Sequence, residues 1–192
     1  GNKFLSHIRE VDAICEVVRC FNDPNVIHVE GNADPIRDIE IINIELTLAD
    51  LEVIQNRISK IEKKAQTTKD KEALKELTLL NTINDALTND IPVRRLKFTS
   101  EEEKMIKSFN LLTSKPIIYI ANIKESDIGL ENEYTKLVRD YALKDNADVI
   151  EMCAKIESEI SSLDDEERTL FLNELGIKES GLDSLIKSTY SL

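Results

Sequence analysis

Three short runs of apolar residues, at 12–21, 115–122 and 147–153, stand between polar and helix-like segments of the chain. Each run is rich in β-branched residues, which is typical of strands buried on both faces of a sheet. The segment between the second and third runs carries an apolar stripe at helical spacing, formed by Tyr134, Leu137, Val138, Tyr141 and Ala142. The order strand, helix, strand predicts the α/β class, with a parallel sheet and crossover helices.

Residues 34 to about 90 depart from this alternation of strand and helix, because the segment is too long and too helical for an ordinary crossover. Asp34 and Pro35 predict a helix start, with an N-cap followed by proline at the first helical position. Apolar residues then recur at intervals of three and four at Ile41, Ile44, Leu48, Leu51, Ile54 or Gln55, Ile58, Ile61 and Ala65. After the polar stretch at 66–70 they continue at Ala73, Leu77, Leu80, Ile83 and Leu87. The pattern predicts an antiparallel coiled-coil hairpin, and the alternative is a pair of helices packed flat on the domain.

The composition is that of a globular protein, because 41% of the 192 residues are apolar and 32% are charged. This length suits one domain, or a core with an appendage. No apolar run approaches the roughly 18–20 residues that span a bilayer, and no signal-peptide pattern is present. We therefore expect a cytoplasmic protein that does not contact membranes, and we expect it to be a monomer.

The sequence predicts no metal site. Cys15, Cys20 and Cys153 form no CxxC pair, so we expect buried thiols of a reducing compartment instead of a disulfide or a zinc site. Two histidines are too few and too scattered to bind a metal. The acidic cluster at 164–167 is expected to begin a short helix and not to hold an ion, and a second short helix is expected after Gly176.

The net charge of −12 argues against binding of nucleic acid over most of the protein surface, yet the predicted hairpin is locally basic. Between residues 57 and 75 there are seven basic residues against three acidic ones, a local charge of +4. The seven are Arg57, Lys60, Lys63, Lys64, Lys69, Lys71 and Lys75. Such a patch can be a solvated face, or it can contact RNA phosphates, and both interpretations stay open here.

The candidate binding residues follow the second and third predicted strands. Ligands of parallel α/β sheets bind at the carboxyl ends of strands, where Asn122 and the sequence Cys153-Ala154-Lys155 stand. Asn122 and Glu125 form an Asn-x-x-acid loop like the base-reading loop of P-loop nucleotidases, which for guanine normally reads Asn-Lys-x-Asp. The Cys-Ala-Lys sequence stands where such proteins often have Ser-Ala-Lys. The alternative is a plain surface turn after a strand.

The residue types in this loop weigh against guanine. A carboxylate can accept hydrogen bonds from the N1–H and the amine of guanine, whereas it would repel the N1 lone pair of adenine. Glu125 is one methylene longer than the Asp that suits guanine, and Ile123 stands where guanine readers have Lys. Adenine can be read by backbone groups near Ile123 and by the Asn122 amide, which donates and accepts. We expect the side chain of Lys124 to point away from the base.

Several of these stretches closely resemble the YchF-type, Obg-like ATPase family. The resemblance covers essentially all 192 residues, and VVRCF at 17–21 and DPIRDIEIINIEL at 34–46 are its most specific parts. It implies a partial nucleotide-binding domain at 1–33 and 99–192, with a coiled-coil helical insertion at 34–98. It implies an ATP-binding hydrolase that prefers ATP over GTP, uses Mg²⁺, acts as a switch and engages the ribosome. By position, Asn122, Ile123 and Glu125 match the base loop, and Cys153, Ala154 and Lys155 match a second purine-side loop.

The resemblance does not extend to the phosphate side of the site. No GxxxxGK[ST] sequence occurs in these 192 residues, and the chain opens Gly-Asn-Lys without Met. We therefore expect a middle fragment that keeps the base-reading residues, with the Mg²⁺ ligands in a preceding part and a TGS domain following. No residue of this chain is predicted to be catalytic, and the fragment alone is expected to be inactive. The alternative is a non-enzymatic coiled-coil interaction module on a truncated α/β scaffold.

Overall fold

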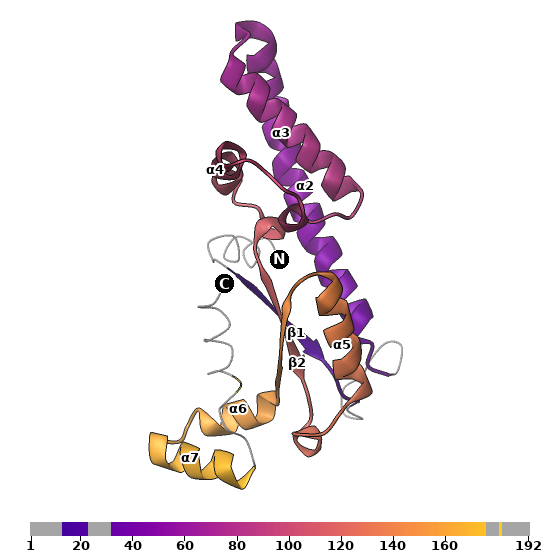
Figure 1. The fold of residues 1–192 in the computed structure, drawn as a ribbon, viewed down its shortest axis with the longest axis vertical. Helices are drawn as coiled ribbons and strands as arrows, with labels where there is room; N and C mark the ends of the chain where they lie inside the picture. The colour runs from indigo at the N-terminus through magenta and orange to yellow at the C-terminus, as the bar shows by residue number, and fades with distance from the viewer. Residues whose placement is uncertain (1–12, 23–31, 176–180, 182–192) are drawn as a thin grey trace. The chain divides into compact units, whose positions relative to one another are not determined.

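A computed structural model describes residues 13–22, 32–175 and 181 of the chain (Figure 1). The helix expected after Gly176 lies outside these residues. The strands are β1 (Ile14–Arg19), β2 (Ile117–Asn122) and β3 (Asp148–Met152). The helices are α2 (Pro35–Thr68), α3 (Lys71–Thr88), α4 (Ser100–Phe109), α5 (Glu133–Lys144), α6 (Ala154–Ile160) and α7 (Asp165–Glu174). Short 3₁₀ turns are η1 (Val93–Arg95), η2 (Leu112–Ser114) and η3 (Glu125–Asp127).

The chain divides into two compact units. One unit contains residues 1–14 and 41–116, and the other contains residues 15–40 and 117–192. The first unit holds α3, α4 and most of α2, and the second holds β2, β3 and the helices that follow them.

The three strands form one parallel sheet in the order β1-β2-β3, which confirms the predicted α/β class. β2 and β3 pair in register from Ile118 opposite Asp148 to Asn122 opposite Met152. On its other side β2 receives a hydrogen bond from the Cys20 N–H at the Asn122 carbonyl, at 2.8 Å. β2 is the central strand and is buried over its whole length before Asn122, as its continuous apolar run predicts.

The crossover helix α5 connects β2 to β3. Asn132 caps its first turn by accepting a hydrogen bond from the Tyr134 N–H at 2.7 Å. Val138 and Ala142 of the predicted stripe are buried, whereas Leu137 is 46% exposed, so the packed face is narrower than the pattern predicts.

Two long helices occupy the segment that was expected to form a hairpin. α2 and α3 are joined only by Lys69 and Asp70, and Figure 1 shows them side by side. Lys69 has a φ of 50°, in the left-handed region, and this reverses the chain within two residues. No helix in the described part of the chain has an apolar stretch that would cross a membrane.

The core between these helices follows the predicted stripe in α3 and departs from it in α2. Residues of α3 share one buried cluster with Ile54 of α2, with Val93 of η1 and with α4. In the first half of α2, however, Ile41, Ile44 and Leu48 are 55%, 53% and 60% exposed, so their predicted packing is wrong. The buried residues in this half of α2 lie along a different face of the helix from the predicted stripe. One of them is charged, and a pattern of apolar residues cannot reveal it.

That charged residue is Asp50, whose side chain is fully buried in α2. Its Oδ1 accepts a hydrogen bond from the Leu112 N–H at 2.9 Å. Its Oδ2 accepts bonds from the Thr113 N–H at 2.7 Å and from the Thr113 hydroxyl at 2.6 Å. A buried carboxylate is tolerated only when such donors replace its water. Asp50 therefore anchors η2, the turn that leads into β2.

We predict that Asp50→Ala lowers the free energy of unfolding by about 3 kcal/mol, because buried backbone donors of η2 lose a charged acceptor. Asp50→Asn keeps one acceptor oxygen and should lose less. Glu45→Ala removes an exposed carboxylate from the same helix and should change stability by less than about 0.5 kcal/mol. Urea unfolding followed by circular dichroism measures all three. A loss below about 1 kcal/mol for Asp50→Ala would show that the anchor is dispensable.

Candidate functional site

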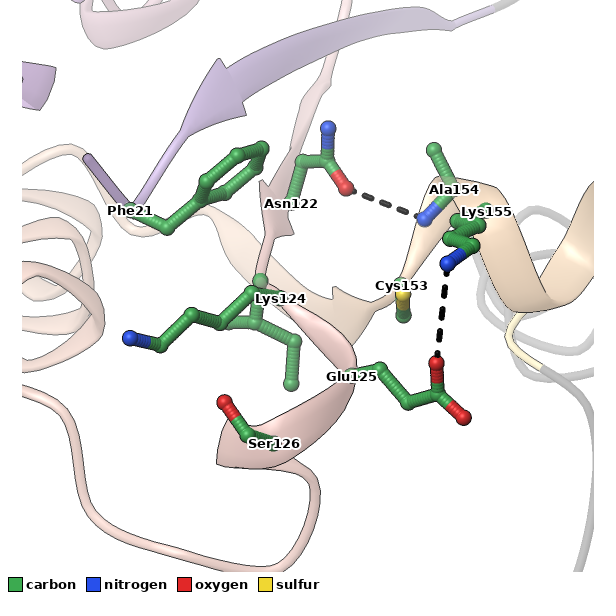
Figure 2. Close-up of a pocket in the computed structure, with 9 residues that line it drawn as sticks. Phe21, Asn122, Lys124, Glu125, Ser126, Cys153, Ala154 and Lys155 are labelled. Atoms are coloured by element: carbon green, nitrogen blue, oxygen red, sulfur yellow. Dashed lines mark hydrogen bonds and ion pairs between the residues drawn. The ribbon is translucent and has the colours of Figure 1, made fainter. Parts of the chain in front are cut away.

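A cavity of about 630 Å³ opens at the carboxyl ends of β2 and β3 (Figure 2). All six residues singled out from the sequence line it, namely Asn122, Ile123, Glu125, Cys153, Ala154 and Lys155. Phe21, Lys124 and Ser126 complete the lining. The structure therefore brings together two loops that are about 30 residues apart in the chain.

The register of the sheet places these loops side by side. Asn122 lies opposite Met152 at the ends of the two strands, and the Ile123 N–H donates to the Met152 carbonyl at 2.9 Å. One step further, the Asn122 Oδ1 accepts a hydrogen bond from the Ala154 N–H at 3.0 Å (Figure 2). The first loop is thus fastened to the first residue of α6.

This bond restricts what the Asn122 amide can offer a ligand. Its oxygen is occupied by Ala154, while its Nδ2 makes no hydrogen bond to any described residue. The amide therefore keeps two N–H donors for a ligand, while one of the two lone pairs of its oxygen is engaged.

Apolar groups make up much of the remaining surface. Ile123 and Cys153 are each only 6% exposed, and Phe21 follows the end of β1. Apolar walls with a few polar groups are the usual lining of a small-molecule site. Phe21 is not among the residues singled out from the sequence, although an aromatic residue at the carboxyl end of a predicted strand is a signal that could have identified it.

Two charged side chains from different loops meet at the rim of the cavity. The Lys155 Nζ lies 3.9 Å from the Glu125 Oε2, and the two side chains are 72% and 48% exposed. Figure 2 shows Glu125 reaching from η3 toward Lys155 on α6. An ion pair at this exposure contributes little to folding.

Lys124 is expected to point its side chain away from the base, and this stays a prediction. It lines this cavity and also a neighbouring one of about 290 Å³. Its backbone is extended, with φ −79° and ψ 156°, and consecutive side chains on extended backbone point to opposite sides. Lys124 therefore extends toward Phe21 while Glu125 extends toward Lys155, as Figure 2 shows.

Asn132 supports the base of the first loop. Its Nδ2 donates to the Cys20 carbonyl at 2.7 Å and to the Asp127 Oδ2 at 3.2 Å. It therefore ties the end of β1 to η3 while its oxygen caps α5. Asn132 is not among the residues singled out from the sequence, and its position at the start of a predicted helix is the signal that could have identified it.

Cys20, which follows the end of β1, is not activated. Burial, with smaller contributions from the negative charges of Glu151 and Asp38, raises the pKa of Cys20 to about 12. A thiol with this pKa stays protonated at neutral pH and is a poor nucleophile. Cys20 and Cys153 are buried as expected, but Cys15 is exposed. Within the described residues, no group of three or more His, Cys, Asp or Glu is placed to hold a metal ion.

Comparison with known proteins gives relatives that match the whole chain. No protein-family model matches it. The chain is 53% identical over 194 residues to a protein of Bacillus subtilis named ribosome-binding ATPase YchF, and 48% identical to the protein of that name from Haemophilus influenzae. The fold is similar to that of the Schizosaccharomyces pombe YchF GTPase, with a TM-score of 0.87 and 33% identity over all of this chain. The chain spans 53%, 52% and 52% of these three proteins, about half of each.

We predict that Asn122→Ala lowers the free energy of unfolding by about 1 kcal/mol, because the Ala154 N–H loses its acceptor. Asn122→Asp retains an oxygen at the same place and should remain close to the unsubstituted protein. Urea unfolding gives the stability, and hydrogen exchange of the Ala154 amide reports the bond itself. Unchanged exchange of that amide in Asn122→Ala would contradict the assignment of this contact.

Proposed function

Because the chain belongs to the YchF family, we propose that it carries the purine-reading residues of a cytoplasmic, ATP-preferring nucleotide hydrolase that acts as a switch and engages the ribosome. The observation that carries this proposal is the meeting of the Asn122 loop and the Cys153-Ala154-Lys155 loop on one cavity. The cavity lies at the carboxyl edge of a parallel sheet, where nucleotides bind in folds of this class.

The lining supports recognition of a flat base. Ile123 and Cys153 offer apolar surface, and Asn122 offers amide donors from a position fixed by its bond to Ala154. The cavity of about 630 Å³ falls within the size range of ligand pockets. Both purines present an acceptor at N7, so the Asn122 donors suit adenine and guanine equally.

Selection between the purines must therefore come from other residues. Ile123 is apolar where guanine readers have Lys, and Glu125 is longer than the Asp of a guanine loop and is paired with Lys155. Both features disfavour the carboxylate contact that guanine uses. The names of the relatives disagree on the nucleotide, because two bacterial proteins are named ATPases and the fission yeast protein a GTPase.

The role that we assign to the residues of this chain is base recognition. Transfer of a phosphoryl group depends on a phosphate cradle and Mg²⁺ for charge stabilisation. These 192 residues contain no GxxxxGK[ST] sequence, so we assign no catalytic residue and no Mg²⁺ ligand among them. ATP binding would bring Mg²⁺ with its phosphates.

We predict that the complete protein binds ATP more tightly than GTP. Ile123→Lys combined with Glu125→Asp should move the preference toward GTP by roughly 1–3 kcal/mol, the worth of one well-made polar contact to a charged group. Equilibrium titration of both forms with ATP and GTP is the measurement. Glu131→Asp, an exposed acid outside the cavity, should leave the preference unchanged. Tenfold tighter binding of GTP by the unsubstituted protein would refute the proposal.

The ribosome contact is proposed through the basic residues near the turn between α2 and α3. Two of the seven are engaged within the protein. Arg57 donates to the Ser108 carbonyl at 3.1 Å and stacks 4.8 Å from the Phe109 ring, and Lys75 lies 3.5 Å from Glu101. The other five, Lys60, Lys63, Lys64, Lys69 and Lys71, are exposed and form no ion pair with a described residue. These five are available to phosphates, and they carry the proposal.

We predict that reversing the charge at Lys60, Lys63 and Lys64 weakens binding of the complete protein to ribosomes. Each lost phosphate contact should also reduce the dependence of binding on salt. Cosedimentation with ribosomes at several salt concentrations measures both effects.

A matched control places the same three reversals at Lys104, Lys136 and Lys144, which are exposed on other helices. This variant changes the net charge equally and should bind like the unsubstituted protein. Equal weakening in both variants would mean that overall charge, and not the hairpin, governs binding. Full binding after reversal of Lys60, Lys63 and Lys64 would make the hairpin a solvated face.

A further inference from the structure

One ion pair bridges the two loops of the cavity. Lys155 is the second residue of α6, and Glu125 is the first residue of η3. Their charged atoms lie 3.9 Å apart, and both residues line the cavity. Within the described residues, no other ion pair connects these loops.

The backbones on both sides of this pair are fixed. Ala154, immediately before Lys155, donates its N–H to the Asn122 side chain at 3.0 Å. The Glu125 carbonyl accepts the Ile128 N–H at 3.2 Å, which closes the η3 turn. The two side chains therefore start from defined positions that bring their charged ends together (Figure 2).

The chemistry of this pair differs from that of a lone carboxylate. A free Glu125 would present only acceptors, which suit the N1–H and amine of guanine and repel the N1 lone pair of adenine. An adjacent ammonium neutralises the carboxylate and brings three N–H donors to the same place. The pair as a unit can therefore donate toward an acceptor such as adenine N1.

We infer that Lys155 determines the choice of purine by holding Glu125 in an ion pair, so that the rim of the cavity accepts adenine and disfavours guanine. This inference rests on the proposed function, in which the cavity takes the base of a nucleotide. Lys155 is a specificity-determining residue in this account, and its effect appears only with a base present. In the free protein the pair is exposed to water and contributes little.

The test uses equilibrium binding of ATP and GTP to the complete protein and to variants. Lys155→Met removes the ammonium and keeps an unbranched stem, and we expect the GTP-to-ATP ratio of dissociation constants to fall at least fivefold. Lys155→Arg keeps the pair and should keep the ratio. Lys144→Met removes an exposed lysine that does not line the cavity, and should change the ratio less than twofold.

A double-mutant cycle assigns the effect to the pair. In a Glu125→Gln background there is no carboxylate to release, so Lys155→Met should no longer shift the ratio. The urea midpoint of Lys155→Met should match that of the unsubstituted protein, which separates a role in specificity from a role in folding.

The outcomes separate this inference from the proposed function. A protein that prefers ATP, but whose ratio is unmoved by Lys155→Met, overturns the inference and leaves the proposed function standing. The same conclusion follows if Lys155→Met shifts the ratio equally with Glu125 or Gln at position 125. If the complete protein binds neither ATP nor GTP, the proposed function fails and the inference fails with it.

Discussion

The parallel pairing of β2 with β3 is the constraint on which the candidate site depends. Its register brings Asn122 opposite Met152, and every contact between the two loops is built on that alignment. A slip of one residue would turn each side chain to the other face of the sheet, so the site tolerates no alternative pairing. The buried run of β2 keeps this strand in the centre of the sheet, because its apolar side chains would otherwise be exposed.

In the function proposed above, the site separates recognition of a purine from the choice between purines. The Asn122 Oδ1 accepts a hydrogen bond from the Ala154 N–H, and this bond fixes the position of the Nδ2 donor group of the same amide. A donor so placed reads a feature that adenine and guanine share. We therefore assign discrimination between the purines to the rim of the cavity, where the exposed side chains of Glu125 and Lys155 meet.

The sequence predicts the strands, the crossover helix and the two loops well, because continuous apolar runs and strand-end motifs are local signals. It fails where tertiary structure decides the outcome. Asp50 is polar and so falls outside any apolar stripe, yet it is buried, and the packed line of α2 passes through it instead of Leu48. The role of Phe21 depends on which strands are neighbours.

An exposed ion pair can select a ligand more effectively than it stabilises a fold. In water the attraction between Lys155 and Glu125 is offset by hydration and by the side-chain entropy lost in forming the pair. A base that covers the rim removes part of that water, and the same charges then act in a lower effective dielectric. Guanine, the disfavoured base, would bring its N1–H donor against the N–H donors of the Lys155 ammonium, and leaving these donors unpaired is a larger penalty than the pair's contribution to the free protein. Selectivity can therefore be altered at this position without loss of the fold, which is held by the buried sheet and by Asp50.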